Sequence, residues 1–219
     1  DLPAYLDGQV VEVLQGQGAV IETVASLVQG IFGIGGERSG ELIVVVQSPE
    51  EPLTADLVKP EHRGKILVGG SLIEWPALKR ACESGVRGLI GGGFHSRYLK
   101  EWLGYEIGVA ITGDENVPTT LILTEGFGLI PMARRSFDLL KSCQGKKASI
   151  SGRTQVRAGV IRPEVIIPLQ GEVTDMPSAT SLHSGLQPGD QVRLIRQPYF
   201  GTLGKVVELT PQPMEIETG

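Results

Sequence analysis

Residues 64–93 read GKILVGGSLIEWPALKRACESGVRGLIGGG and decide the expected fold. A short apolar strand, ILV, precedes a stretch whose apolar residues recur at helical spacing, and VRGLI follows as a second apolar strand. Ser71 is a candidate N-cap for the helix, and Gly85 is suited to end it. Strands that alternate with helices in this way predict a sheet with parallel strands.

The pattern continues downstream and predicts a small α/β unit over residues 63–170. Its sheet is expected to be parallel or mixed, and a trailing β ribbon begins near residue 153. The further elements that we expect are a helix at 95–104, strands at 106–112 and 117–128, a helix at 131–143 and a strand at 147–152.

Upstream, residues 1–62 are β-rich. Apolar and polar residues alternate around Gly16 and Gly18, which predicts a hairpin, and ELIVVV at 41–46 fits a buried strand. This unit resembles the barrel-sandwich pieces of lipoyl-like domains. No lysine lies at a hairpin tip, so the resemblance implies no lipoyl or biotin attachment site. Residues 48–64 form a proline-punctuated connector with one helical turn.

After a polar linker at 171–184, the last segment carries a resemblance to a known family. The run GDQVRLIRQPYFGTLGKVVEL at 189–209 resembles the KOW motif of NusG-type elongation factors and certain ribosomal proteins. This implies a partial SH3-like barrel over 185–219, cut short at the end of the chain, with Val192 and Leu194 pointing inward. The matching positions are Gly189, Asp190, Val192, Pro198, Phe200, Gly201, Gly204 and Val206.

The order of units also resembles uncharacterised bacterial proteins with a C-terminal KOW-like segment. The expected fold is therefore α+β and multi-domain: a barrel-sandwich-like β unit, an α/β unit and a KOW-like barrel. KOW segments in the better-known families contact RNA, ribosomes or transcription partners, so the resemblance implies binding and not catalysis.

Charge is unevenly distributed along the chain. The net charge is −5, yet residues 129–163 hold eight basic residues and one acidic residue, whereas residues 1–62 hold ten acidic and two basic. One interpretation is an anionic partner, nucleic acid or protein. The other is that the basic segment faces the acidic first 62 residues. The candidate partner-binding residues are Arg134, Arg135, Lys146, Lys147, Arg153, Arg157, Arg193 and Arg196.

Two glycine-rich segments form a candidate ligand site. Each follows an expected strand and precedes an expected helix, where backbone N–H groups can bind an anion. The alternative interpretation is that both are ordinary strand-to-helix turns. The candidate ligand-binding residues are Gly91, Gly92, Gly93, His95 and Ser96 in the first segment, and Glu125 and Gly126 in the second.

Several other functions find no support in the sequence. Cys82 and Cys143 are expected to be free thiols, and no histidine lies at metal-ligand spacing. We therefore expect no metal and no cofactor. No catalytic constellation is visible, so we lean against an enzyme. With no apolar run of membrane-spanning length, we expect no membrane partner and a cytoplasmic location.

The leading hypothesis is a non-enzymatic binding or scaffold protein that contacts nucleic acid or a protein through the KOW-like segment and the basic residues. The alternative is a ligand-binding or enzymatic α/β domain that uses the segments at 91–97 and 125–128. Homo-oligomerisation is left open.

Overall fold

The fold is taken from a computed structural model. It describes residues 4–105, 115–155, 161–169, 188–189, 191–194 and 203–209. The chain divides into two compact units, residues 1–171 and 172–219. The expected strand at 106–112 and the linker at 171–184 lie outside the described residues.

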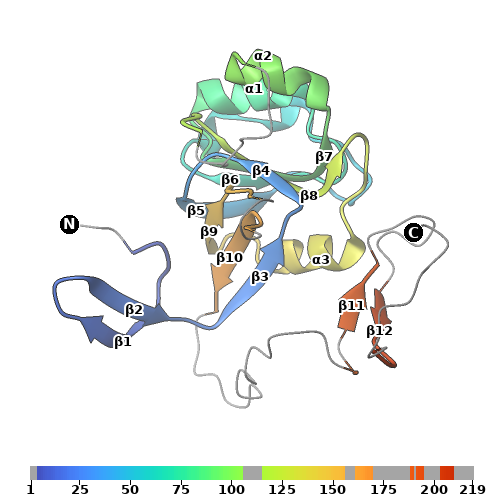
Figure 1. Cartoon of the computed structure of the whole chain (residues 1–219). Coiled ribbons are helices and arrows are strands. Elements are labelled where there is room, and N and C mark those ends of the chain that lie inside the picture. Colours follow the sequence, from blue (N-terminus) through green and yellow to red (C-terminus); the bar gives the residue numbers. More distant parts are fainter. Residues whose placement is uncertain are drawn as a thin grey trace. The chain divides into compact units, whose positions relative to one another are not determined.

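The first unit is built around one mixed sheet of eight strands (Figure 1). Four neighbouring strands at its centre are parallel, and the others join antiparallel. In spatial order the strands are β3 (Ala25–Gln29), β10 (Glu164–Pro168), β9 (Lys147–Ser151), β5 (Arg38–Val44), β6 (Ile66–Val68), β7 (Gly88–Phe94), β8 (Thr120–Phe127) and β4 (Phe32–Ile34).

The two ends of this sheet are joined by the chain itself. β3 and β4 lie at opposite ends of the strand order, yet only Gly30 and Ile31 separate them. Their amides donate to the carbonyl oxygens of Pro163 and Leu123, at 2.7 and 2.8 Å. A flat sheet of this size would be about 33 Å wide, whereas the link reaches only about 11 Å. The sheet must therefore curl until its ends meet.

Three α-helices cover the sheet. They are α1 (Trp75–Ser84), α2 (Leu99–Leu103) and α3 (Arg134–Ser142). Figure 1 shows α1 and α2 on one side of the parallel strands and α3 on the other. Short 3-10 turns occupy Ala55–Leu57, Pro60–His62 and Ser96–Tyr98.

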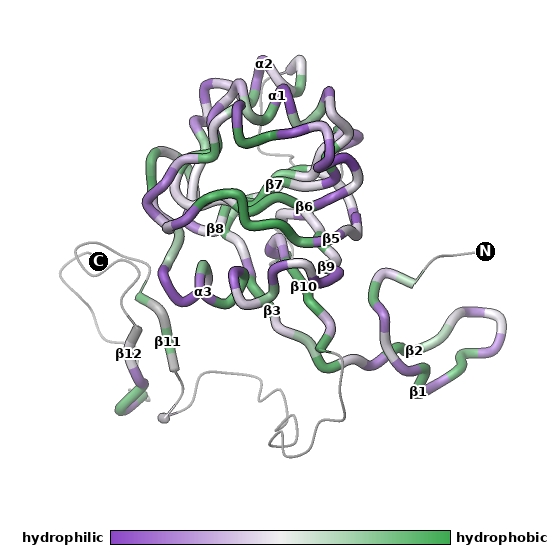
Figure 2. The backbone as a smooth tube through the Cα atoms, turned by 180° about the vertical axis from the view of Figure 1, so that it is seen from behind, coloured by the Kyte–Doolittle hydropathy of each residue, from purple (hydrophilic) through white to green (hydrophobic). Residues whose placement is uncertain are grey.

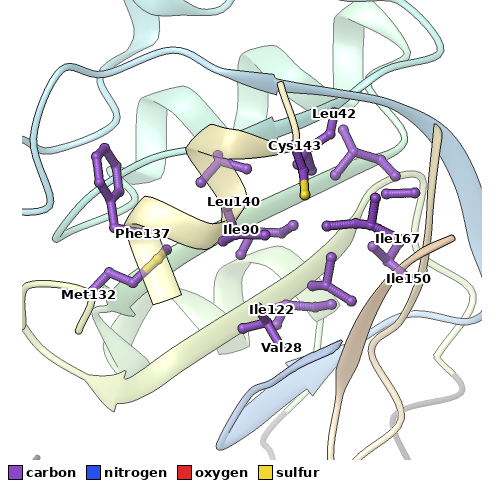
Figure 3. Packing of buried hydrophobic residues seen from close by; sticks show 14 of the residues in the cluster. Val28, Leu42, Ile90, Ile122, Met132, Phe137, Leu140, Cys143, Ile150 and Ile167 are labelled. Atoms are coloured by element: carbon purple, nitrogen blue, oxygen red, sulfur yellow. The ribbon is translucent and has the colours of Figure 1, made fainter. Parts of the chain in front are cut away.

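Successive side chains of the parallel strands point to opposite faces of the sheet, which produces two hydrophobic cores. Ile90 of β7 and Ile122 of β8 pack with Phe137 of α3, whereas their neighbours Leu89 and Leu121 pack towards α1. Figure 3 shows the first core, with side chains of α3 over those of β7 and β8. Figure 2 shows the same strands as the most continuous apolar stretches of the backbone. Because both faces are buried, the strands are nearly all apolar, as parallel strands between helices must be.

The mixed α+β class is confirmed, and several local details differ from expectation. β5 pairs with β6 across the expected unit boundary between residues 62 and 63, so the strands of residues 25–44 belong to the same sheet as the α/β segment. Glu74, not Ser71, is the N-cap of α1, because the helix begins at Trp75. Ser71 Oγ donates to the carbonyl of Glu50 at 2.7 Å. Gly85 ends α1 in the left-handed conformation, as expected.

Two antiparallel hairpins complete the described structure. β1 (Gln9–Leu14) and β2 (Gly18–Glu22) form the hairpin expected around Gly16 and Gly18. In the second unit, β11 (Gln191–Arg193) pairs with β12 (Leu203–Lys205), and the Gly189 amide donates to Val206. Leu194 is 42% exposed, so the expectation that it points inward is wrong.

Candidate functional site

The structure places the two glycine-rich segments side by side. In the parallel pair of β7 and β8, Gly93 lies opposite Gly126 and Phe94 lies opposite Phe127. Both segments are at the carboxyl ends of neighbouring parallel strands, where ligands bind in open α/β sheets. They are strand and not turn, however, because β7 continues to Phe94 and β8 to Phe127.

The amides of this region already have partners. Gly92 donates to the carbonyl of Gly70 at 3.0 Å, and Gly93 donates to that of Ser71 at 2.6 Å. A Cβ on Gly92 would lie 2.8 Å from the Met132 nitrogen and closer still to the Ile130 carbonyl oxygen. The glycines thus allow the chain around residues 128–132 to approach β7. These two N–H groups do not face an open anion site.

Glu125 is buried at the end of β8, with 5% of its surface exposed. Its Oε1 accepts a hydrogen bond of 2.9 Å from the backbone N–H of Ala133, the N-cap residue of α3. A carboxylate at this position satisfies one of the donors that a helix N-terminus leaves open, and its charge matches the helix dipole. Glu125 therefore holds the start of α3 against the sheet.

His95 and Ser96 follow directly after β7 and are accessible to solvent. The His95 ring lies 6.4 Å from that of Tyr98, which stacks on Trp75 at 5.7 Å with the planes 9° apart. Two cations flank this pair: the Arg97 guanidinium lies 4.8 Å from the Tyr98 ring, and Lys79 Nζ lies 5.2 Å from the Trp75 ring. Sequence reasoning missed this aromatic and basic group, because its members come from two separate helical segments.

The basic residues of α3 lie on its outer side. Phe137 and Leu140 turn inward to the core, whereas Arg134, Arg135 and Lys141 are exposed. The turn into β9 adds Lys146 and Lys147, which are exposed as well. We call these five residues, Arg134, Arg135, Lys141, Lys146 and Lys147, the α3 basic surface.

Two of these cations pair with carboxylates from the acidic first 62 residues. Lys147 Nζ lies 2.8 Å from Asp7 Oδ2, and Arg134 Nη2 lies 3.4 Å from Glu50 Oε1. The interpretation that the basic segment neutralises the acidic one is thus supported in part. Both pairs are exposed, and such pairs contribute only about 0–1 kcal/mol. An anionic partner can therefore exchange with these carboxylates at little cost.

A cavity of about 480 Å³ lies next to this surface and is lined by Asp7, Gly145, Lys146, Lys147 and Pro168. Among the described residues, the Lys146 ammonium has no carboxylate partner. The cavity thus adds a concave, cationic part to the α3 basic surface.

The remaining basic candidates are scattered or lie elsewhere. Arg153 follows β9 and is exposed. Arg193 is in β11 of the second unit. Arg157 and Arg196 lie outside the described residues. The structure therefore gathers Arg134, Arg135, Lys146 and Lys147 around one helix and the turn that follows it.

The thiols and the candidate metal ligands of the described residues are further candidate sites. Cys82 and Cys143 are free, as expected. Burial raises the pKa of the Cys82 thiol, which lowers its reactivity. Within the described ranges, no group of three or more His, Cys, Asp or Glu side chains could hold a metal ion, and no helix is long and apolar enough to cross a membrane.

No protein-family model, curated protein or solved structure matches this chain. What the protein does is therefore inferred from its residues and their geometry.

Proposed function

We propose that this chain is a non-enzymatic binding protein that contacts the phosphate backbone of nucleic acid through the α3 basic surface. The observation that carries the proposal is the set of five exposed cations on α3 and the turn into β9. Cations spaced along one helix can each neutralise a phosphate and release its counterions, which is the main source of sequence-independent affinity. Base stacking contributes little here, because the aromatic ring of α3, Phe137, is buried.

The resemblance to KOW segments extends the proposal to the second unit. We assign residues 185–219 to a partial SH3-like barrel of the KOW type, and residues 1–62 to a barrel-sandwich-like part. The turn at Gly189 and the pairing of β11 with β12 support the first assignment. We also propose a cytoplasmic location. A protein partner would compete for the same cations.

The alternative is a small ligand at the ends of β7 and β8. Its support is that His95 and Ser96 are accessible at the carboxyl end of β7. The occupied amides of Gly92 and Gly93 count against an anion held by the backbone there.

The test is fluorescence anisotropy with labelled single- and double-stranded RNA and DNA, from about 50 to 200 mM salt. The unaltered chain is compared with Arg134→Glu/Lys146→Glu. We expect salt-sensitive binding that the double reversal weakens by about tenfold or more, because two phosphate contacts become repulsive.

The matched control is Lys79→Glu/Arg80→Glu, which makes the same change of charge on α1. This control should bind like the unaltered chain. Equal loss in both variants would mean that only net charge matters. Absence of binding at the lowest salt would contradict the proposal and direct attention to His95 and Ser96.

A further inference from the structure

The cavity of about 480 Å³ beside the α3 basic surface already contains an anion that the chain itself supplies. The carboxylate of Asp7 belongs to its lining, and both carboxylate oxygens lie 2.8 Å from the Nζ of Lys147. An ammonium group contacts the oxygens of a phosphate in the same way. The cavity therefore accepts an oxyanion, and its occupant comes from the acidic first 62 residues.

The backbone that carries the two lysines of the cavity is fixed to the sheet. Gly145 donates to the carbonyl of Leu42 at 2.8 Å, and the carbonyl of Lys146 accepts from the Leu42 amide at 2.9 Å. Lys147 is the first residue of β9, which pairs with β5. The sheet thus determines where both lysines lie, independently of the carboxylate.

Asp7 belongs to a segment that has anchors of its own. Before it, the Tyr5 carbonyl accepts a hydrogen bond of 2.6 Å from Ser149 Oγ. After it, Gly8 passes so close to β2 that a Cβ would lie 2.5 Å from the Glu22 carbonyl oxygen. These contacts hold the carboxylate near the cavity at a high effective concentration. They do not depend on its charge, so Asp7→Asn should leave the segment in place.

The ion pair is open enough to be exchanged. The side chains of Lys147 and Asp7 are 57% and 64% exposed. Pairs this open shift an equilibrium by at most about fivefold, because water screens both charges. Lys146 lines the same cavity and has no carboxylate partner in the ranges that the structure describes. An incoming phosphate can therefore contact Lys146 first and then replace the carboxylate.

We propose that Asp7 is an internal competitor, which occupies Lys147 until a phosphate of the bound nucleic acid displaces it from the cavity. The inference rests on the proposed function, which supplies that phosphate. The volume lies within the range of ligand sites, about 300–1,000 Å³, so a phosphate has room beside the lysines. The apparent affinity is lowered according to the fraction of chains in which Lys147 is paired.

A double-mutant cycle of Asp7→Asn and Lys147→Gln tests the competition. Binding of the same labelled RNA and DNA is measured by fluorescence anisotropy at about 50 mM salt. Asp7→Asn should strengthen binding about two- to fivefold, because Lys147 becomes available to a phosphate. Lys147→Gln should weaken binding more in the Asp7→Asn background than in the unaltered chain, where the cation is partly occupied. Additive effects of the two substitutions would overturn the proposal.

Asp138→Asn is the matched control for charge. It removes one negative charge from an exposed side chain of α3, which forms no ion pair among the described residues. Its effect on affinity measures the general repulsion of phosphates, and that effect should be equal with and without Lys147. If Asp7→Asn strengthens binding no more than Asp138→Asn does, Asp7 is not a competitor.

A probe other than nucleic acid separates this proposal from the function on which it rests. Inorganic tripolyphosphate is titrated into the isotope-labelled chain, and the NMR shifts of the Gly145 and Lys147 amides report its binding. Asp7→Asn should lower the apparent Kd of this probe about two- to fivefold, and Asp138→Asn should lower it less. A Kd that Asp7→Asn leaves unchanged, or the absence of shifts in both proteins, overturns the competition.

The two failures are then distinguishable. If neither the unaltered chain nor Asp7→Asn binds nucleic acid, yet the tripolyphosphate Kd falls as expected, the proposed function is wrong and the competition at the cavity stands. If nucleic acid binds through Arg134 and Lys146 but its affinity does not depend on Asp7, the proposed function stands and the internal competitor is overturned.

Discussion

Gly92 shows how a single residue without a side chain determines the packing of the sheet. The chain near Ile130 passes so close to β7 that a Cβ has no room, and the Met132 amide lies 2.8 Å from where it would stand. The neighbours of this position are backbone atoms, which cannot rotate away as a side chain does. Tight packing of backbone on backbone explains the glycine run better than an anion site does.

Gly92→Ala is therefore expected to lower the free energy of unfolding by about 1–3 kcal/mol or more, the cost of overpacking a closed core. Gly36→Ala is the control, because a Cβ there has nothing within 4 Å. Guanidinium unfolding of both variants measures the effect. Equal midpoints for the two would contradict the packing that we describe.

Glu164 gives a pH-dependent prediction at the same scale. Burial first, and the nearby charge of Glu37, raise the pKa of its carboxyl, and the proximity of Tyr5 opposes them. An acid whose pKa is higher in the folded than in the unfolded protein binds more protons when folded, so its contribution to stability falls as pH rises between the two values.

Glu164→Gln should therefore raise the melting temperature at pH 7 and have little effect at pH 4. The gain should stay below about 1 kcal/mol, because the carboxylate is partly exposed and screened by water. Thermal melts of both proteins across this range measure it. A larger gain in melting temperature at pH 4 than at pH 7 would show that the pKa of Glu164 is not raised in the folded protein.

Among the secondary-structure elements, α3 connects the core with the α3 basic surface. Phe137 and Leu140 bury one side of the helix, and its cations occupy the other. Glu125 of β8 anchors the start of α3 to the sheet through the Ala133 N–H. This buried carboxylate therefore helps to determine where Arg134 and Arg135 lie.

Glu125→Ala is expected to cost about 1–2 kcal/mol of stability through loss of the bond to the Ala133 N–H. Glu125→Gln keeps an oxygen that can accept this bond and should cost less. Urea unfolding compares the two. If Glu125→Gln is less stable than Glu125→Ala, α3 depends on the negative charge of Glu125 or on another contact of its side chain, and not on the bond to Ala133.

At the scale of the whole molecule, the closure of the sheet links distant segments of the first unit. Residues 30 and 31 bond to Leu123 on one side and to Pro163 on the other, so the two ends of the strand order depend on each other. Every strand of the large sheet lies before residue 171.

A chain that ends at residue 171 is therefore expected to retain the main unfolding transition of the full-length chain, within a few degrees. Differential scanning calorimetry of both measures it. A loss of the cooperative transition on truncation would show that residues 172–219 contribute to the stability of the sheet.

Local patterns in the sequence were sufficient for the elements whose signals are short-range. The hairpin at Gly16 and Gly18, the alternation of strands and helices, and the stop of α1 at Gly85 all follow from periodicity and backbone preference within a few residues. The uneven charge also predicted the basic surface of α3, since exposed cations must stay in water.

Those local patterns do not predict which distant strands pair with each other. Nothing near residues 25–44 indicates that they join the sheet of the α/β segment, and nothing near Gly91–Gly93 indicates that β7 continues through them, because both depend on hydrogen bonds to partners far along the chain. The irregularity in the pairing of β1 with β2, between Val10 and Glu12, likewise depends on the register of the two strands. Strand pairing and sheet closure are decided by which backbone groups meet in space, and that requires the folded chain.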